Sequence, residues 1–554
     1  MEIPKQVGES IRQSKIILGK KMKTLHLDKE FDKMFELLYS KKNFAFLRFA
    51  DGERAIMLQD NVESQEGWVV PHNENFAKDL FQALTLEDNN VFYAISCPCC
   101  DFPAAYWYQQ HIKNKNLTFA NLWINKNHRR FRQYFDKLRR EAVVVANFRA
   151  KDKQIGNLNI LQYYEISDDC EGFYKNELKG LLKQIKEDLS IGKLQGKKNL
   201  LFVVSAGHLS EIIIYDLFRF DKEQTYVDFG SSVDCYYKDY NKDKAHKRPY
   251  MIAGNEYAKR NCYLEIYESN EMDISVVLNL YKRPYALPLQ LEAIKNQSLK
   301  PKEILLYQDG VFEGIEIPKE CKAQFDNIEI SQVNKGVWER FRFAQKANSP
   351  FVCVFDDDTI PSRDYLANCF YQMTQQGGGL YGAIGIVLQN PQNYPNSDFK
   401  RLGWANPNES RVEVDFVGHS WFFKKEWLDD LFAGTKSLQD FKTAGEDMGF
   451  SLALQRKGIK TFVPPQPYKK PHLWGNNPQY AKKYGDDNVA LFNADESKTK
   501  YNNAIKEAIN LGLKTLKERD LATYKQTLII YRQSRFNLFK HRVKKLAKIL
   551  LGRK

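Results

Sequence analysis

A chain of 554 residues is too long for one ordinary domain, because domains span roughly 100–200 residues, so we expect two to four. Hydrophobic residues make up 43% and charged residues 27%, which is typical of folded globular proteins and excludes a shortage of core material. The formal charge of +14 favours anionic partners, namely nucleic acid, an anionic membrane surface or phosphorylated substrates, without choosing among them.

The opening residues and the cysteines bear on the compartment. The stretch MEIPKQVGESIRQSK has no apolar signal-peptide core, and no run of about 18 apolar residues predicts a transmembrane helix. The nine cysteines are scattered and odd in number, which fits reduced thiols in a cytoplasmic protein. Only CPCC, Cys97–Cys100, is clustered, and without a second pair at zinc-ribbon spacing we expect no metal site there.

Residues from about 28 to 265 alternate apolar, β-rich runs with amphipathic stretches. The runs NFAFLRFADGE, VFYAISCP, EAVVVANF and NLLFVVSAG predict strands within 43–53, 91–98, 141–148 and 199–207. The stretch KNELKGLLKQIKEDLSIGKL predicts a helix within 175–194. Strands that alternate with helices predict a parallel or mostly parallel sheet.

The first predicted strand runs directly into acidic residues, in FLRFADGERAIM. Asp51 and Glu53 could share a metal ion, and Gly52 between them allows a tight bend of the backbone. Arg48 and Arg54 could contact phosphate groups. A salt-bridged turn would account for the same residues.

Two later stretches place polar groups at the ends of further strands. LLFVVSAGHLSEIIIYDLF predicts a strand, a glycine turn at Gly207 and a helix start, which would offer backbone N–H groups to a diphosphate. TYVDFGSSVDCYY predicts another strand, with Asp228 and Asp234 at its end. Many α/β folds contain such a glycine turn, so it does not identify a ligand alone.

The polar stretch GNEYAKRNCYLEIYESNEMD predicts a connector, after which the pattern starts afresh. DISVVLNLYKRP predicts a strand and turn, LPLQLEAIKNQSL a helix, and KPKEILLYQDG a second strand. RFRFAQKANSPFVCVFDDD predicts a helix followed by a third strand. We therefore place a domain boundary near residues 265–272.

The third strand leads straight into Asp356, Asp357 and Asp358. Packed carboxylates repel each other, and their burial costs several kcal/mol unless a hard cation such as Mg²⁺ or Mn²⁺ neutralises them. Ligands of open α/β sheets bind at the carboxyl ends of strands, where these aspartates lie. The cation would bridge to a sugar-nucleotide diphosphate and stabilise the departing group. A charged turn facing water would also explain DDD taken alone.

The last residues, YRQSRFNLFKHRVKKLAKILLGRK, predict a basic amphipathic helix. Its apolar positions recur at helical spacing: Leu538, Phe539, Val543, Leu546, Leu550 and Leu551. Its charges come from Lys540, Arg542, Lys544, Lys545, Lys548, Arg553 and Lys554. Such a helix could lie on an anionic membrane, which would place the protein at the inner face of the cytoplasmic membrane, or pack on the protein body.

The ordered motifs from about 272 to 475 resemble inverting family-two glycosyltransferases with the GT-A fold. The resemblance implies nucleotide base and ribose contacts at Asn279, Tyr281, Arg283 and Asp309. FDDD matches the metal-binding aspartates of that family. By this resemblance Asp356 and Asp358 hold the metal, and Asp357 contacts the sugar nucleotide.

The same resemblance extends to the catalytic base. VDFVGHSWFFKKEWL looks like the family's acceptor-side segment, and AGEDMGFSLALQRKG resembles its catalytic-base segment. An inverting transfer needs one base for the acceptor hydroxyl proton. The resemblance assigns it to Asp447, with Glu446 as the alternative, although the helix macrodipole alone would favour acids there. His472 in KKPHLWG lies where some GT-A enzymes supply a metal ligand.

Residues from about 28 to 250 resemble the GT-D glycosyltransferases. The Arg-x-x-Asp-Gly-Glu motif of that family appears as Arg48, Asp51, Gly52 and Glu53. The family's late segments appear as Gly207, and as Asp228 with Gly230. The resemblance implies catalytic or metal-binding roles for Asp51 and Glu53, and sugar-nucleotide contacts at Arg48, Gly207 and Asp228. Ser231 stands where the family usually has a histidine after its glycine, which bears on donor preference and activity.

We therefore expect the α/β fold class, with two Rossmann-like nucleotide-sugar-binding domains. The GT-D-like domain would span 1–265, the GT-A domain 272–480, and a helical basic tail 481–554. The resemblances predict a bifunctional glycosyltransferase that uses Mn²⁺ or Mg²⁺ and nucleotide sugars, most simply UDP-sugars. Its acceptor would be a bacterial surface glycan of capsule, lipopolysaccharide or glycoprotein, or its lipid-linked form.

Two other functions remain to be compared with this one. The first is a single active GT-A transferase whose N-terminal domain is non-catalytic and binds acceptor or supports assembly. The second is a nucleic-acid-binding protein that uses its positive charge. The lysines are dispersed, and the sequence has no helix-turn-helix, zinc-finger or RNA-binding aromatic motif, so we expect no nucleic-acid partner.

Overall fold

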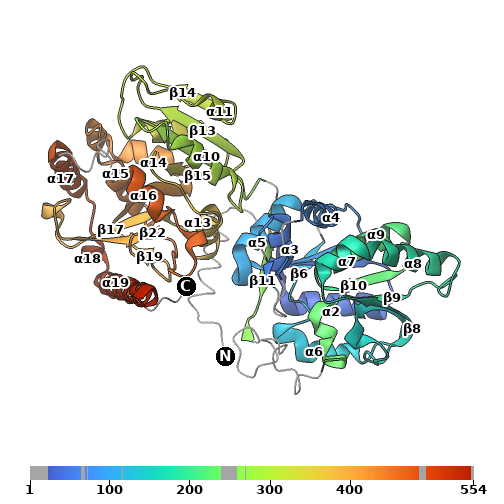
Figure 1. Ribbon diagram of the computed structural model, residues 1–554. Coiled ribbons are helices and arrows are strands. Elements are labelled where there is room, and N and C mark those ends of the chain that lie inside the picture. The colour runs from blue at the N-terminus through green and yellow to red at the C-terminus, as the bar shows by residue number, and fades with distance from the viewer. Residues whose placement is uncertain are drawn as a thin grey trace. The chain divides into compact units, whose positions relative to one another are not determined.

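The computed structural model describes residues 23–60, 62–63, 69–70, 73–114, 116–238, 259–268, 270–485 and 495–550 (Figure 1). The chain divides between Ile266 and Tyr267 into two compact units, which we call the N-terminal and C-terminal units. Both are mixed α/β structures built on largely parallel sheets. We describe each unit by itself.

The N-terminal unit is built on a seven-stranded sheet whose neighbouring strands all run parallel. Its order is β6 (Leu117–Phe119), β5 (Val91–Ile95), β2 (Ala45–Phe49), β10 (Thr225–Asp228), β9 (Leu201–Ser205), β7 (Glu141–Asn147) and β8 (Asn159–Ile166). Each of the five apolar runs picked out in the sequence contains one of these strands. The sequence analysis did not predict two of the strands. β6 is only three residues long, and β8 is an edge strand whose side chains are mostly half-exposed.

The strand order of this sheet reverses between β2 and β10. On one side the chain steps outward from β2 to β5 and β6, and on the other side lie the strands that come later in the sequence. A parallel sheet opens a crevice at such a switch point, beyond the carboxyl ends of its strands. The segments after β2 and β10 are therefore the ones that line a ligand site.

Helices connect these strands and cover the sheet. They are α2 (Leu27–Tyr39), α3 (Asp51–Met57), α4 (Glu74–Leu84), α5 (Pro98–His111), α6 (His128–Phe135), α7 (Cys170–Asn176), α8 (Leu178–Ser190) and α9 (Ser210–Phe220). The helix expected within 175–194 is α8, whose buried Leu181, Ile185 and Leu189 follow helical spacing.

The predicted polar connector is only partly correct. Its described part contains the strand β11 (Tyr263–Ile266), which pairs antiparallel with β1 (Lys23–His26) and so belongs to the N-terminal unit. Its residues 254–258 lie outside the described part of the chain. The strand was overlooked because YLEI is short and carries a glutamate, although Leu264 and Glu265 are both buried.

The C-terminal unit is built on an eight-stranded mixed sheet. Its order is β14 (Asn327–Ile330), β13 (Glu303–Gln308), β12 (Ile274–Leu280), β15 (Phe351–Phe355), β21 (Ser420–Lys424), β16 (Leu380–Tyr381), β22 (Thr461–Val463) and β19 (Val412–Glu413). The strands from β14 to β15 are parallel, and β21 runs antiparallel to β15. A second sheet holds β18 (Phe399–Gly403), β17 (Ile384–Leu388) and β20 (Phe416–Gly418).

The helices of this unit are α10 (Leu287–Lys295), α11 (Lys319–Lys322), α12 (Glu339–Ala344), α13 (Tyr365–Gln375), α14 (Trp427–Gly434), α15 (Glu446–Gln455), α16 (Pro478–Gly485), α17 (Asp495–Asn510), α18 (Leu516–Arg519) and α19 (Leu521–Leu550). Every residue of β13 and β15 is buried, because helices and neighbouring strands cover the middle of the sheet. The packed centre therefore fixes where these two strands end and where the residues after them lie.

The described residues from 481 onward are mostly helical, but they are not a tail separate from the body. α17 packs against α15, and Asn502 donates hydrogen bonds to the carbonyls of Gln392 and Tyr394. Arg519 pairs with Glu413 at the sheet edge, and Thr527 of α19 is buried. Side chains at 541, 542 and 544–550, and all of 551–554, lie outside the described part. No described helix is both long and apolar enough to cross a membrane.

Candidate active site

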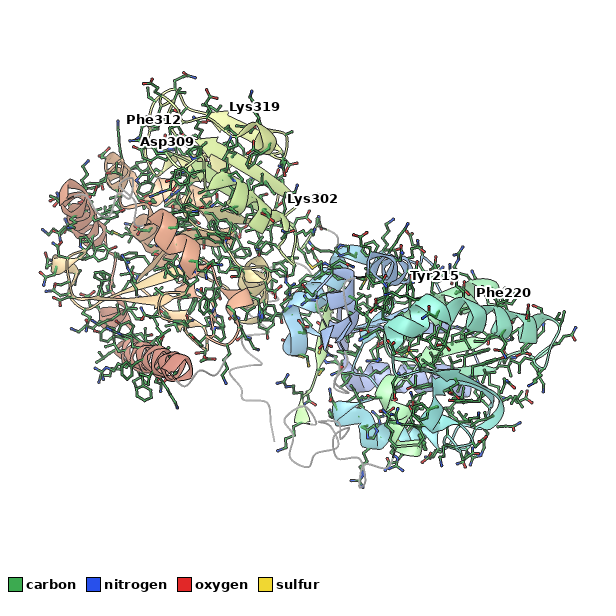
Figure 2. All side chains as sticks on the ribbon, in the orientation of Figure 1. Tyr215, Phe220, Lys302, Asp309, Phe312 and Lys319 are labelled. Carbon is green, nitrogen blue, oxygen red and sulfur yellow. The ribbon has the colours of Figure 1, made fainter. Side chains whose placement is uncertain are left out.

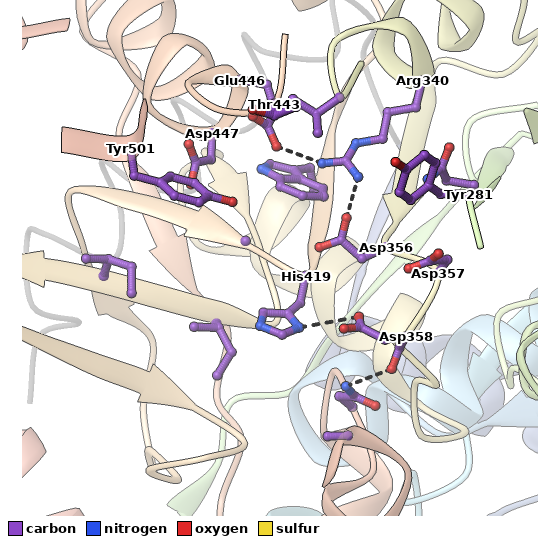
Figure 3. A pocket seen from close by; sticks show the side chains of 18 of the residues that line it. Tyr281, Arg340, Asp356, Asp357, Asp358, His419, Thr443, Glu446, Asp447 and Tyr501 are labelled. Carbon is purple, nitrogen blue, oxygen red and sulfur yellow. Dashed lines mark hydrogen bonds and ion pairs between the residues drawn. The ribbon is translucent and has the colours of Figure 1, made fainter. Parts of the chain in front are cut away.

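A cavity of the C-terminal unit lies beyond the carboxyl ends of β12, β13 and β15 (Figure 3). Its volume is about 330 Å³. Segments far apart in the sequence line it. Predicted site residues in its wall are Asn279, Tyr281, Arg283, Asp309, Asp356, Asp357, Asp358, Glu446 and Asp447. The fold thus gathers residues that follow separate strands into one place, as expected for ligand sites in α/β sheets.

The three consecutive aspartates have different surroundings. Asp357 is buried, and its Oδ1 accepts a hydrogen bond of 2.6 Å from Nη1 of the equally buried Arg283. Burial raises the pKa of Asp357 to about 6 against the opposing effect of Arg283, and the two flanking aspartates add to the rise. The ion pair of Asp357 with Arg283 is therefore a buried part of the cavity wall. Asp356 and Asp358 are half-buried and more open.

Asp356, Asp358 and His419 form a group that could hold a metal ion, because one ligand atom from each lies within 4.8 Å of the others. His419 sits in the turn between β20 and β21 with a left-handed backbone, φ 65°, and its carbonyl accepts the Asp356 N–H at 3.0 Å. Its Nδ1 lies 3.8 Å from Oδ1 of Asp358 and has no hydrogen-bond partner among the residues that the structure describes. Two carboxylates and an imidazole nitrogen fit a divalent cation such as Mn²⁺.

The structure does not bring His472, the predicted metal ligand, to the aspartates, so its metal role stays a prediction. His472 lies in a short 3₁₀ turn (Pro471–Leu473), is exposed, and is absent from the cavity wall. Its backbone carbonyl accepts the Asp364 N–H, which directs this segment to the start of α13 rather than to the aspartates. His419 takes the position instead, and the only sequence signal was a histidine within the predicted acceptor-side segment VGHSW.

Arg340 connects the aspartates after β15 with the acidic start of α15. The sequence analysis did not predict it as a site residue. This buried side chain on α12 pairs through Nη1 with Asp356 and through Nη2 with Glu446, the latter at 2.8 Å (Figure 3). Its guanidinium also lies 4.6 Å from the ring centre of Trp421. Arg340 thereby neutralises part of the acidic cluster, and Glu446 is already engaged in an ion pair.

Of the two carboxylates at the start of α15, Glu446 forms an ion pair with Arg340 and Asp447 does not. It is the second residue of α15, and its Oδ1 accepts the N–H of Met448 at 2.8 Å. Burial and the neighbouring Glu446 raise the pKa of Asp447 well above its ordinary value. Tyr501 of α17 lines the same part of the cavity (Figure 3), and burial with these two carboxylates raises its pKa well above 10. Asp447 therefore has the environment of a proton acceptor.

The predicted nucleotide-binding residues surround the other end of the cavity. Tyr281 places its ring edge-on to Phe312, with centroids 5.4 Å apart, and its hydroxyl accepts a hydrogen bond from Asn334. Asp309 follows β13 (Figure 2), and its carboxylate accepts the backbone N–H groups of Lys335 and Gly336 at 2.8 and 3.0 Å. Asp309 thus holds the loop before α12 in place, a positional role that the sequence did not suggest.

The N-terminal unit has a cavity of about 470 Å³ at its strand-order switch point. Arg48, Asp51, Glu53 and Gly207 line it, whereas the fully buried Asp228 lies behind the wall. Asp228 accepts a 2.8 Å hydrogen bond from Nε of Arg48, so this pair joins the ends of β2 and β10. A side chain at 230 would clash with the Arg48 guanidinium, which explains Gly230 next to this pair.

Glu53 does not have the surroundings of a metal ligand. One of its carboxylate oxygens accepts the Ala50 N–H at 2.8 Å, and the other lies 2.5 Å from Nδ1 of His208. Burial opposes the charge of Glu53, but His208 outweighs it and holds the pKa at about 2. Among the described residues, neither Glu53 nor Asp51 belongs to a group of three or more metal-ligating side chains. Their predicted metal role stays a prediction that this geometry does not favour.

His208 was missed, although it follows the glycine turn that the sequence reading singled out. A Cβ at position 52 would clash with the His208 ring, so Gly52 is what lets the histidine reach Glu53. Asp51 is exposed at the rim of the cavity. Asp234 pairs with Lys238 at 2.9 Å at the same rim. The cavity thus combines an acid–imidazole pair with the cationic side chains of Arg48, on β2, and Lys238.

The expectation of no metal site at CPCC did not allow for a cysteine from a distant segment. Cys262 lies against Cys97, Cys99 and Cys100, and one Sγ atom from each of the four is within 4.8 Å of the others. The sequence could not show this because the fourth cysteine is far along the chain. All nine cysteines are free thiols.

No family model matches the chain, and no curated protein matches it either. Among solved structures, S. aureus TarS gives a TM-score of 0.27 at 14% identity, over 43% of this chain and 43% of that chain. The mannosyltransferase PcManGT from Pyrobaculum calidifontis, in complex with GDP-Man and Mn²⁺, gives 0.25 at 17% identity, over 51% and 88%. Because both TM-scores are low, we base the function on the geometry of the site.

Proposed function

We propose that the chain is a metal-dependent glycosyltransferase whose donor site is the C-terminal cavity. One observation carries this proposal: Asp356 and Asp358, which follow β15, meet His419, which precedes β21, and the three share a cavity with Asp447. A cation there would hold a diphosphate, and a nearby carboxylate would accept a proton. The mixed sheet, with four parallel strands followed by the antiparallel β21, supports the GT-A resemblance.

In an inverting transfer, the residues of this cavity would have separate roles. Asn279 and Tyr281 would face the nucleotide, while Asp356, Asp358 and His419 would hold Mn²⁺ or Mg²⁺. When bound, the cation would offset the negative charge that develops on the leaving diphosphate. Asp447 would take the proton of the acceptor hydroxyl as that oxygen attacks the anomeric carbon from the opposite side. Arg340 would hold Asp356 and Glu446 in place through its two ion pairs.

The proposal extends to a second transfer in the N-terminal unit. Its cavity lies at the switch point of a parallel sheet, and Arg48, Gly207 and the Glu53–His208 pair line it, where they would face the phosphate groups of a donor. A bifunctional enzyme would add two sugars, from UDP-sugars in the simplest case, to a bacterial surface glycan or its lipid-linked form. Two sites on one chain would raise the effective concentration of the intermediate at the second site.

Two variants of the full chain test whether both cavities are active. Asp447→Asn should abolish turnover of one donor, and Glu53→Gln should abolish turnover of a different donor, measured as nucleoside diphosphate release across a panel of sugar nucleotides with glycan acceptor. Both substitutions keep the shape of the side chain and remove its charge. If Glu53→Gln leaves every turnover unchanged, the N-terminal unit is non-catalytic and the chain is a single GT-A-type transferase.

A peripheral membrane contact is proposed for α19. Phe536 and Phe539 are about two-thirds exposed on this helix, beside the exposed basic residues Arg535 and Lys540. Phe536→Ser with Phe539→Ser should weaken binding to phosphatidylserine-containing vesicles several-fold in a sedimentation assay, because buried ring area drives such contacts. Val333→Ser, at a comparably exposed position away from this helix, is the matched control. Unchanged binding of the double variant would remove the membrane contact.

A further inference from the structure

We propose that Cys97, Cys99, Cys100 and Cys262 bind one zinc ion in a closed structural site of the N-terminal unit. This zinc site is distinct from the residues to which the proposed function gives a role in sugar transfer. It is built from one short segment, CPCC, and one residue that the sequence places far away. The fold alone brings the four thiols together.

The distances fit a single tetrahedral ion. Four sulfurs at about 2.3 Å from zinc lie about 3.8 Å from one another. In the structure Sγ of Cys100 lies 3.8 Å from Sγ of Cys262, Sγ of Cys99 lies 3.3 Å from Sγ of Cys97, and the whole set fits within 4.8 Å. In a [4Fe–4S] cluster each thiolate binds a different iron, and in a [2Fe–2S] cluster the four thiolates are divided between two irons, so in both the sulfurs spread wider than around one ion.

Neither a disulfide nor ordinary core packing accounts for the cluster. A disulfide needs a sulfur separation of about 2.05 Å, and the Cys97–Cys99 and Cys100–Cys262 sulfurs are well beyond it. Cys97 and Cys262 are 1% and 4% exposed, so water can reach little of either thiol. A soft divalent ion satisfies four such sulfurs at once, since thiolate is the ligand that zinc prefers in structural sites.

The surroundings would balance the net negative charge of a zinc–tetrathiolate centre. Asn121 donates its Nδ2–H to Sγ of Cys262 at 3.2 Å, and Arg260 lies 3.9 Å from Sγ of Cys100. Cys97 is the N-cap of α5, and the N–H groups of Cys100 and Asp101 point back to its carbonyl. N–H···S contacts and nearby cations stabilise and orient metal-bound thiolates in the same way.

The position of the site indicates what the ion would do. Cys97 and Cys100 lie in the wall of the N-terminal cavity, at the junction of β5 and α5. Cys262 directly precedes β11, the strand that pairs with β1. The ion would fasten this last strand of the unit to the cavity wall. Four protein ligands leave no open coordination position, so the role is structural rather than catalytic.

The first test is metal analysis of the full-length protein, purified without added metal. We expect about one zinc per chain, and four of the nine thiols protected from a thiol reagent until the zinc is removed. Reconstitution with Co²⁺ should give the intense sulfur-to-cobalt charge-transfer bands of tetrahedral thiolate coordination. A protein that contains no stoichiometric zinc and gives no such bands, with these cysteines freely reactive or disulfide-bonded, overturns the proposal. So does stoichiometric iron with cluster absorbance.

Variants locate the ion. Cys100→Ser together with Cys262→Ser should bring the zinc content from about one to near zero and lower the melting temperature of the N-terminal unit. Cys235→Ser, half-buried elsewhere in this unit, should retain the zinc. Asp358→Asn should also retain it, because that site belongs to the other unit. Zinc that persists in the double cysteine variant but disappears in Asp358→Asn would overturn the assignment.

Discussion

Replacing Asp447 with asparagine is expected to lower sugar transfer by roughly 10²–10⁴-fold, the usual range for loss of a general base. Asparagine keeps the shape of the side chain and can still accept the Met448 N–H, but it cannot take a proton from the acceptor hydroxyl. Donor binding should remain, because Asp447 is not in the metal group. Transfer rate and donor affinity are measured separately, by product formation and by titration with the nucleoside diphosphate.

Glu446→Gln is the matched comparison, since Glu446 is the adjacent carboxylate and is paired with Arg340. We expect a smaller loss of rate there, through displacement of Arg340. The pH profile gives a second readout. Because burial and Glu446 raise the pKa of Asp447, its ionised fraction grows with pH through a range above that of an ordinary aspartate, and the rate should rise with it. A full rate in Asp447→Asn would return the base to Glu446.

The sequence was sufficient wherever local pattern decides the structure. The buried run FVCVF could hardly be anything but a central strand, and a strand of known direction delivers Asp356 and Asp358 to the carboxyl edge of the sheet. The same logic placed Arg48 and Glu53 in the N-terminal cavity. In both cases a short apolar segment sets the geometry of the polar residues that follow it.

The sequence was insufficient wherever a site is completed by a distant segment. His419 and Cys262 reach their partners only through the fold, and His472 looked equally suitable in the sequence. Arg340 lies on a predicted helix, yet nothing in a helical pattern shows that its guanidinium is buried between two acids. Such ion pairs are decided by tertiary packing, because burial alone makes pairing obligatory.

Two glycines show how a motif can be recognised before its reason is visible. Gly52 of the DGE motif was predicted to allow a tight bend of the backbone. Instead it lies in helix α3, and its missing side chain makes room for His208. Gly230 similarly leaves space for Arg48, and its φ of 46° adds a backbone requirement. The physical cause in each case is the approach of a side chain from another strand end.

Removal of divalent cations should abolish transfer by the C-terminal site, and replacement of His419 should raise the Mn²⁺ concentration needed for activity. Loss of a single outer-shell partner costs roughly 10–100-fold in metal affinity, so we expect at least that for a direct ligand. His419→Asn is preferred, because asparagine tolerates the left-handed backbone at φ 65°. Mn²⁺ titration of the chelator-treated protein, followed by manganese electron paramagnetic resonance, measures the affinity without reference to turnover.

His472→Asn is the matched control for this experiment, since it makes the same chemical change at an exposed histidine outside the cavity wall. It should bind Mn²⁺ as the unaltered protein does. The opposite pattern, weakened binding in His472→Asn with normal binding in His419→Asn, would mean that the loop after β22 reaches the aspartates when the metal is present. Transfer that continues in excess chelator would instead separate Asp356 and Asp358 from metal binding, and would leave Arg283 and Arg340 as the cations that face a diphosphate.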